Sequence, residues 1–456
     1  MIKTSLAILS LAFVAACAAT PVADLPERRG ATLPAALPPM AMFGTPRPVA
    51  STRSNTEIAR DFLELSFEME SGRAIPTLSR FEGPVTVAVA PGAPVTLNRD
   101  LERLIARLRA EARIDIRQVA NGPAPASITI QTLPRARMQR AVPQAACFVV
   151  PRVSSWAEFR QARRSAGALD WTTLETRERV AIFIPSDVSP QEVRDCLHEE
   201  IGQALGPLND LYRLSDSVFN DDNFHAVLTG FDMLILRTYY DDALVSGMSR
   251  AEVAARLPAI LSRLNPTGNR AAASGPSRPH RQWIASMEDA LGDRLPLQSR
   301  IAAAERAVQI AVAQGWSDTR IGFSHFALGR LTLARDANRS VRAFVTAGTY
   351  FRRIDPNGIQ VAHVNMQLAA FALSAGEADQ VLALVGDALP AATRAENASL
   401  LATLLMLRAE ALELQGRPSE AATVRLDSLG WARYGFGADQ AVRERLTEVA
   451  ALPPQS

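Results

Sequence analysis

The sequence predicts an α+β domain followed by an all-α helical-repeat domain, and three observations lead to this prediction. Between residues 56 and 264, short β-branched runs alternate with segments whose apolar residues recur at helical spacing. From residue 283 to 452 the spacing is almost wholly helical. A break rich in Pro, Gly and Ser, at residues 265–282, separates the two regions as a linker.

The chain begins with a segment typical of secretory signals. Lys3 precedes the apolar stretch Leu6–Ala16, which is too short to span a bilayer as a permanent helix. The stretch ends at Val14-Ala15-Ala16-Cys17, which resembles the lipobox of bacterial lipoproteins, in which the cysteine is acylated and the signal is cut just before it. We therefore predict a signal peptide at residues 1–16 and lipidation of Cys17. An ordinary signal peptide cut near the same alanines is the alternative.

The lipid anchor predicts a cell-envelope protein whose soluble part lies in the periplasm or at the cell surface. Residues 17–55 are rich in Pro and Ala without sustained periodicity, so we expect an extended tether. The net charge of +2, with arginines mixed among carboxylates, argues against a nucleic-acid partner. Lys3 is the only lysine and leaves with the signal, which excludes lysine chemistry in the mature protein.

The α+β domain, residues 56–264, has a first strand at residues 84–89 and then a helix that we expect Asn98 to cap. Further strands are predicted at residues 114–119, 127–133, 147–153 and 180–184. This order predicts a sheet covered by helices, and it leaves open whether the sheet is parallel or mixed.

Two cysteines of this domain, Cys147 and Cys196, are expected to form a disulfide because the chain is exported. Closing a loop of roughly 50 residues would stabilise the fold by about 4 kcal/mol. Two free buried thiols are the alternative.

The most informative stretch is a helix predicted between Ser189 and Gly206. Ser189 and Glu192 form a capping box, and Gly206-Pro207 ends the helix. Glu200 falls inside the apolar face of this helix. A carboxylate in such a position must be protonated, paired or bound to something.

The same helix carries a changed metallopeptidase motif. His198-Glu199 begins the zinc motif His-Glu-x-x-His, but Gly202 stands where the second histidine should be. One residue later, Glu199-Glu200-x-x-Gln203-x-x-Gly206-x-x-Asn209-Asp210 resembles the long metzincin motif His-Glu-x-x-His-x-x-Gly-x-x-His/Asp, with every metal-binding histidine replaced. The stretch also resembles a domain-of-unknown-function family of bacterial envelope proteins that share the signature Glu-Glu-x-x-Gln-x-Leu-Gly-x-x-Asn-Asp.

The metzincin resemblance continues downstream. Metzincins follow the motif with a turn built around a methionine beneath the metal, and then with a helix that has an early aspartate and a late tyrosine. Residues 216–221 resemble that turn, with Phe219 in the methionine place, and residues 228–240 resemble the helix. Residues 80–85 resemble the entry to the first strand. The resemblance covers roughly residues 56–248 and implies a mixed sheet with helices.

The resemblance also implies roles for the changed residues. Glu200 keeps the place of the general base, while Glu199, Gln203 and Asn209 or Asp210 stand in the places of the metal ligands. Such side chains offer oxygen, which suits calcium, magnesium or manganese and competes poorly for zinc. The cofactor is therefore unknown, with a divalent metal other than zinc as the candidate.

Two functions follow from these substitutions. We favour a non-hydrolytic domain that binds a peptide or an envelope component. The alternative is an active hydrolase with an oxygen-rich metal site and Glu200 as base, or with His225 recruited as a ligand. The run Asn220–His225 is expected to be a solvated loop, with a calcium loop as the other reading. His198, outside the motif, is expected to pack against a neighbouring element.

The helical domain, residues 283–452, contains an internal repeat. Gly-centred breaks at residues 375–378 and 415–422 lie roughly 40 residues apart, and a weaker copy spans residues 325–351. This arrangement resembles a tetratricopeptide-type solenoid, which implies a concave surface for a protein or peptide partner. An irregular helical bundle is the alternative.

Overall fold

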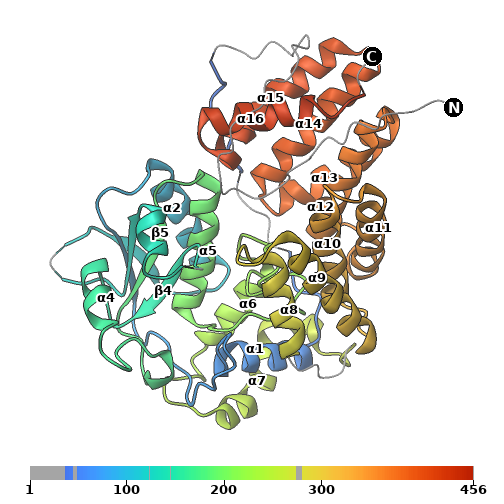
Figure 1. The fold of residues 1–456 in the computed structure, drawn as a ribbon. Helices are drawn as coiled ribbons and strands as arrows, with labels where there is room; N and C mark the ends of the chain where they lie inside the picture. Colours follow the sequence, from blue (N-terminus) through green and yellow to red (C-terminus); the bar gives the residue numbers. More distant parts are fainter. Residues whose placement is uncertain (1–35, 45–48, 123, 144, 274–279, 455–456) are drawn as a thin grey trace. The chain divides into compact units, whose positions relative to one another are not determined.

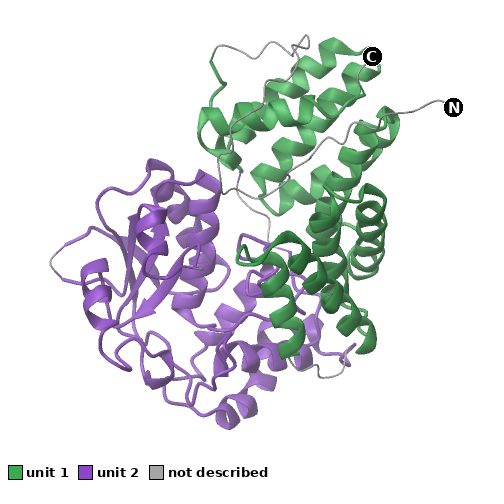
Figure 2. Ribbon diagram, viewed as in Figure 1, with its two compact units in different colours: residues 1–43, 279–456 green, residues 44–278 purple. Residues whose placement is uncertain are grey.

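The computed structural model describes residues 36–44, 49–122, 124–143, 145–273 and 280–454 (Figure 1). The chain forms two compact units, Gly44–Arg278 and a second unit that combines Met1–Phe43 with Pro279–Ser456 (Figure 2). The predicted signal peptide and Cys17 lie outside the described residues. Within the described part of the chain, no helix has the length and apolar character that crossing a membrane requires.

A five-stranded sheet in the order β2-β1-β3-β5-β4 forms the centre of the first unit. Its strands are β1 (Val85–Val89), β2 (Ile116–Val119), β3 (Ile128–Leu133), β4 (Phe148–Pro151) and β5 (Val180–Pro185). β1, β2, β3 and β5 run parallel, and β4 pairs antiparallel with β5 at one edge. The five predicted strands are confirmed, and the sheet is mixed.

Helices cover both faces of the sheet, which is why β5 is buried at every position. Val180, Ile182 and Ile184 belong to the large core that includes α2 (Val95–Ala110) and α5 (Pro190–Leu205). Ala181 and Phe183 belong to a smaller core with α3 (Arg135–Gln139) and α4 (Trp156–Ala162). The alternation of side chains along β5 thus places α5 against one face of the sheet.

The prediction that Asn98 caps the helix after β1 is wrong. α2 begins three residues earlier, at Val95, with Pro94 in the cap position. The fixed backbone angle of a proline suits a helix start. Asn98 lies within the first turns and accepts a hydrogen bond from Gln118 Nε2 at 3.3 Å.

Three further α-helices complete the first unit: α1 (Asn55–Phe67), α6 (Gly230–Tyr239) and α7 (Arg250–Leu264). Short 3-10 helices occur at η1 (Trp171–Thr173) and η2 (Pro266–Gly268). Asn55 at the start of α1 donates to the Asn265 carbonyl and to Asn269 Oδ1. The first residues of the predicted linker are therefore bound to α1, whereas residues 274–279 lie outside the described residues.

The second unit is all helical in its described residues, which confirms the predicted change of fold class. Its helices are α8 (Arg281–Leu291), α9 (Leu297–Ala313), α10 (Thr319–Thr332), α11 (Ala337–Ile354), α12 (Ile359–Ser374), α13 (Ala378–Arg394), α14 (Ala398–Leu414), α15 (Pro418–Phe436) and α16 (Asp439–Ala450). Successive helices pack in pairs, and each pair contacts its neighbours in the sequence. Gly315, Gly376 and Gly416 adopt positive φ at the ends of α9, α12 and α14, where only glycine is free of strain.

Part of the segment that the sequence predicts to be a tether packs along α15. The Ala41 amide donates to the Gly430 carbonyl at 2.9 Å, and Arg433 Nη1 donates to the Pro38 carbonyl at 2.8 Å. The rings of Phe43 and Trp431 lie 4.5 Å apart between centroids. Gly430 permits this approach, because a Cβ there would come 3.3 Å from Ala41 Cβ.

Candidate carboxylate site

The helix α5 carries the predicted site residues, and its boundaries follow from local sequence. The Ser189 hydroxyl accepts from the Glu192 amide at 3.1 Å, and Pro190 occupies the first helical position. The predicted capping box is only half formed, because the Glu192 carboxylate pairs with Arg135 of α3. The helix ends at Gly206, as predicted.

Arg177, which precedes β5, satisfies the last carbonyl groups of α5. Its guanidinium donates to the carbonyls of Gln203 at 2.6 Å, Ala204 at 2.8 Å and Gly206 at 2.6 Å. The final carbonyls of a helix have no partner inside the helix, and they attract a cation. Arg177 is 3% exposed, so this buried charge fixes the end of α5 relative to the sheet.

Glu200 lies within the apolar face of α5, as predicted, and is 3% exposed. Its Oε2 atom is buried without a hydrogen-bond partner among the described residues. Burial is the largest influence and raises the pKa of Glu200 well above its ordinary value, and the charges of Glu199 and Glu70 raise it further. The protonated form of Glu200 is therefore favoured, and its ionised form requires a cation that compensates the charge.

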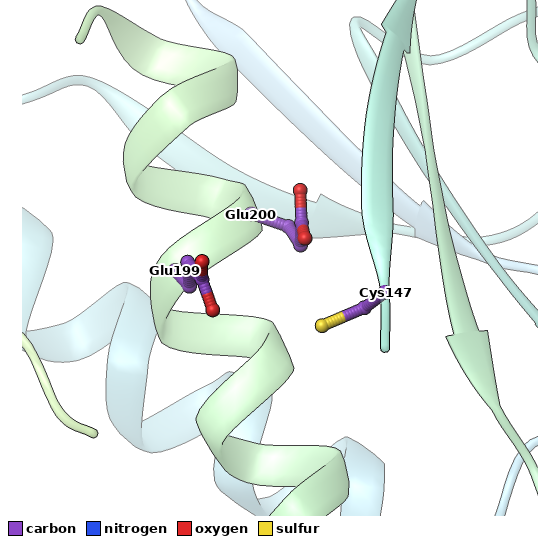
Figure 3. A group of neighbouring side chains, drawn as sticks. All are labelled: Cys147, Glu199 and Glu200. Atoms are coloured by element: carbon purple, nitrogen blue, oxygen red, sulfur yellow. The ribbon is translucent and has the colours of Figure 1, made fainter. Parts of the chain in front are cut away.

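The predicted disulfide between Cys147 and Cys196 is confirmed, with the two Cα atoms 6.0 Å apart. Cys196 lies one helical turn before Glu199 and Glu200, so the bridge joins the start of β4 to α5 beside the two carboxyls. Ligand atoms of Cys147, Glu199 and Glu200 all lie within 4.8 Å of one another (Figure 3). A sulfur held in a disulfide is not a thiolate, so the two carboxyls are the ligands that this group offers to a metal.

Further carboxyls extend this site. Burial, and then the charges of Asp221 and Glu70, raise the pKa of Glu199 to about 8. Burial raises the pKa of Asp210 well above its ordinary value, and Glu70 contributes through its charge and a hydrogen bond. Buried Asp210 Oδ1 has no hydrogen-bond partner in the described chain. We call these five residues, Glu70, Glu199, Glu200, Asp210 and Asp221, the carboxylate cluster.

The other predicted metal ligands, Gln203 and Asn209, have different surroundings. Asn209 is 5% exposed, and its amide Nδ2 donates to the Glu64 carbonyl at 3.0 Å, so it is bound to α1. Gln203 is 9% exposed, one turn beyond Glu199 and Glu200. The structure therefore brings Glu199, Glu200 and Asp210 into electrostatic contact, while Asn209 has a structural partner.

The turn that contains Phe219 packs beneath α5. Phe219 is fully buried, and a Cβ built on Gly202 would come 2.9 Å from its ring atom Cζ. Asp232 near the start of α6 organises this turn, because its carboxylate accepts from the Val218 amide at 3.1 Å and from the Ser217 hydroxyl. Glycine at position 202 thus permits the close contact between the helix and the turn.

The end of α6 contacts the end of α5 in the same way. A Cβ on Gly206 would come 2.8 Å from the ring of Tyr239, which is 1% exposed. Arg80 donates to the Tyr239 carbonyl at 2.7 Å and so satisfies the last turn of α6. Two arginines, Arg177 and Arg80, therefore close the ends of the two helices that border the site.

The loop after Phe219 is more buried than predicted. Asn220 and Asp222 are 2% and 7% exposed, and Asp222 Oδ1 accepts from the Phe224 amide at 3.1 Å. Asn220 Nδ2 donates to Asp222 Oδ2 at 2.8 Å. These side chains support the backbone of the loop, so the prediction of a simply solvated loop is wrong at these two positions.

Both histidines of residues 44–278 hold backbone groups. His198 is 5% exposed, as expected for a packed histidine, and its Nδ1 accepts from the Leu228 amide at 3.1 Å. Burial lowers the pKa of His198 well below its ordinary value, so the ring is neutral and Nε2 carries the proton. His225 Nε2 lies 3.1 Å from the Ser215 carbonyl.

Sequence reasoning did not single out Glu70 or Arg177. Glu70 follows α1 in a short turn and is exposed, and the sequence around it gives no sign that its charge acts on carboxyls of α5. Arg177 stands in the run Arg177-Glu178-Arg179, in which all three residues look like a solvated surface. For Arg177, the position just before a fully apolar strand was the only feature of the sequence that could have indicated burial.

A comparison with models of protein families finds a match over part of the chain. Residues 55–259, from the start of α1 into α7, match the model of a family described as protein of unknown function (DUF2927). The match confirms the expectation of a domain of unknown function over the part of the chain that carries the carboxylate cluster. Neither the curated proteins nor the solved structures contain a match to this chain.

Proposed function

We propose that this protein is a lipid-anchored envelope protein whose first unit, Gly44–Arg278, is a metzincin-like binding domain that does not hydrolyse peptides through zinc. Its helical unit binds a protein partner. The anchor is Cys17, and the proposal rests on the lipobox-like sequence that precedes it.

The order and contacts of the elements support the metzincin-like part of the proposal. The helix with the changed motif is followed by the turn around Phe219, which packs against Gly202, and then by α6. α6 has Asp232 near its start and Tyr239 at its end, and both side chains are buried against neighbouring parts of the site. The metzincin resemblance implies this order along the chain: the helix with the motif, the supporting turn and then the final helix.

The side chains in the places of the zinc ligands support the absence of zinc chemistry, and this is the main observation behind the proposal. A catalytic zinc takes three protein ligands, mostly histidine nitrogens, and one water. In the ligand places stand Glu199, Gln203 and Asn209 or Asp210, and Asn209 already donates to the Glu64 carbonyl. In a neutral His198, Nε2 carries the proton because Nδ1 accepts the Leu228 amide, so its ring has no free lone pair for a metal. These residues do not fit zinc.

The helical unit supports partner binding through its architecture. The pairs α10/α11, α12/α13 and α14/α15 follow one another, and the same glycine geometry ends α12 and α14. The amide of Gly376 bonds to the Leu373 carbonyl, and that of Gly416 bonds to the Glu413 carbonyl. Stacked helix pairs of this kind present extended concave surfaces, which proteins use to bind partners.

The test is zinc content and peptidase activity of the purified chain. We expect no stoichiometric zinc by elemental analysis and no hydrolysis of fluorescently labelled casein, with or without a chelator. The proposal would be contradicted by hydrolysis that the chelator stops and that Glu200→Gln abolishes. Glu102→Gln, at an exposed position of α2, is the control and should then hydrolyse casein as the unchanged protein does. That outcome would favour the active hydrolase with Glu200 as base.

The anchor is tested separately. We expect the protein expressed in bacteria to incorporate a labelled fatty acid and to sediment with membranes, and Cys17→Ser to lose both properties. A Cys17→Ser chain that still carries the label would show that the lipid is attached elsewhere or that the label is not a lipid anchor.

A further inference from the structure

We propose that Glu199, Glu200 and Asp210, with Glu70 and Asp221 beside them, form a binding site for a hard divalent cation of the calcium class. The site goes beyond the proposed function, because a domain without zinc hydrolysis neither needs nor excludes it.

The first argument is the lack of a compensating side chain. Buried carboxylates elsewhere in the first unit have partners. Asp61, which is fully buried, pairs with Arg53 at 3.0 Å and with Arg213. Asp232, also fully buried, accepts hydrogen bonds from the Val218 amide and the Ser217 hydroxyl. In the described part of the chain no arginine forms an ion pair with Glu199, Glu200 or Asp210, and the charges that act on them come from other carboxyls. Buried charges are normally paired or bound to a metal.

The second argument is independent of charge and concerns single atoms. Glu200 Oε2 and Asp210 Oδ1 are both buried, and neither has a hydrogen-bond partner among the described residues. Glu200 is 3% exposed, and one of its oxygens lies within 4.8 Å of a Glu199 oxygen (Figure 3). Buried polar atoms nearly always have a partner, and a cation would supply one for both residues.

The chemistry of the donors selects the kind of ion. Carboxylate oxygens favour calcium, magnesium or manganese, whereas the Cys147 sulfur is held in the disulfide and is not available as a soft ligand. Magnesium keeps several of its water molecules and is usually held by one or two carboxylates, whereas this cluster offers more than two. Glu200 is buried, while Glu70 and Asp221 are exposed. Calcium, which accepts six to eight oxygen ligands in flexible geometry, is therefore the expected occupant.

Protons are the competing occupants. Asp210 and Glu70 are hydrogen-bonded to each other, which requires a proton between two carboxyls. A cluster that only shares protons would gain nothing from calcium. It would become more stable when a carboxyl is replaced by its amide, because the amide cannot ionise.

The experiment uses the purified mature chain, stripped with a chelator and then titrated with calcium at neutral pH. Isothermal titration and the thermal unfolding midpoint measure binding. Terbium luminescence is a second probe, because the Tyr212 hydroxyl donates to Asp221 at 2.5 Å and its ring can sensitise a bound terbium ion. We expect one ion per chain and a midpoint that rises with calcium concentration.

Matched variants locate the ion. Glu200→Gln and Asp210→Asn should each weaken calcium binding by about tenfold or more, because a charged ligand is lost. Glu199→Gln, at a partly buried position, provides a third variant if the others fold poorly. Glu102→Gln removes one exposed carboxylate from α2 and should bind calcium as the unchanged protein does.

Two outcomes would overturn the proposal. If the folded, unchanged protein binds no calcium, manganese or magnesium, and Glu200→Gln raises the unfolding midpoint without any ion, then the cluster holds protons. If calcium binds but Glu199→Gln, Glu200→Gln and Asp210→Asn bind it as tightly as Glu102→Gln does, then the ion lies elsewhere in the chain.

Discussion

The ring of Phe219 lies against Gly202 of α5 so closely that a Cβ on the glycine would come 2.9 Å from Cζ. Both residues are buried, and Leu228 Cδ2 would lie 3.3 Å from the same Cβ. Any side chain at position 202 must therefore displace the turn that supports the helix with the carboxylate cluster.

We predict that Gly202→Ala destabilises the first unit. Overpacking a buried site costs about 1–3 kcal/mol, which exceeds or offsets the roughly 1 kcal/mol that alanine gains over glycine in a helix. Urea unfolding measures the difference. Phe219→Leu in the same chain should recover part of the loss, because it removes the ring atoms that the methyl group meets.

The control is Gly386→Ala in α13, where a Cβ would meet no atom within 4 Å. This substitution should stabilise its helix by up to about 1 kcal/mol. If Gly202→Ala stabilises the protein to the same extent, then the turn yields freely and the close contact carries no constraint.

Loss of the disulfide between Cys147 and Cys196 should lower the free energy of unfolding by about 4 kcal/mol, from the entropy of the loop that it closes. Cys147→Ser with Cys196→Ser, compared with the unchanged protein by urea unfolding, measures this. Thiol titration under denaturing conditions should find no free thiol at these two positions in the unreduced protein. Two titratable thiols there would restore the alternative of buried free cysteines.

Arg177→Leu should destabilise the first unit by about 3 kcal/mol or more, because hydrogen bonds from a charged donor are worth about 1.5–3 kcal/mol each and three helix carbonyls lose theirs. Arg179→Gln is the matched control two residues away. Its pair with Glu158 is 41% exposed on both sides and is worth at most about 1 kcal/mol. Equal losses in urea unfolding would mean that Arg177 does not act through the end of α5.

The raised pKa of Asp232 leads us to predict that the free energy of unfolding depends on pH. Burial raises the pKa of Asp232 from its ordinary value of 3.8 to about 6, against the hydrogen bonds from Ser217, Val218 and Thr229 that lower it. Between these two values the folded protein holds a proton that the unfolded chain has released. This group's contribution to stability therefore falls as pH rises from 3.8 to about 6, by about 3 kcal/mol in total.

The measurement is urea unfolding at several pH values across that range. Asp232→Asn should be less stable than the unchanged protein at low pH, because its amide cannot accept all of these hydrogen bonds, and its stability should fall less as pH rises. Asp242→Asn, at an exposed position, should keep the slope of the unchanged protein. An unchanged slope in Asp232→Asn would show that other carboxyls set the pH dependence.

Local sequence was sufficient to predict much of the site's framework. The five strands, the start of α5 at Ser189 and its end at Gly206 depend on neighbouring residues, so their patterns could be recognised. The burial of Glu200 followed from helical periodicity alone. The disulfide could be predicted because only two cysteines follow Cys17 in the sequence.

The rest depends on partners distant in sequence. Glu70 joins the carboxylate cluster from a turn 120 residues before the start of α5 at Pro190, and periodicity carries no information about such contacts. Glu192 forms an ion pair with Arg135 instead of closing the capping box, because tertiary structure offers it a stronger partner. Asn98 lost its expected role for a local reason, since Pro94 starts the helix earlier.

The contact between residues 36–43 and α15 determines how the molecule would carry mechanical load. The chain enters the helical unit first, leaves it at Gly44 and returns at Pro279, so the sheet-containing unit is an insertion within the helical unit. Tension applied between the N-terminus and the C-terminus would pass through the Phe43–Trp431 contact directly into the helices. The inserted unit would bear that tension only after this contact had ruptured. Residues 36–43 would therefore shield the carboxylate cluster from forces applied at the two ends of the chain.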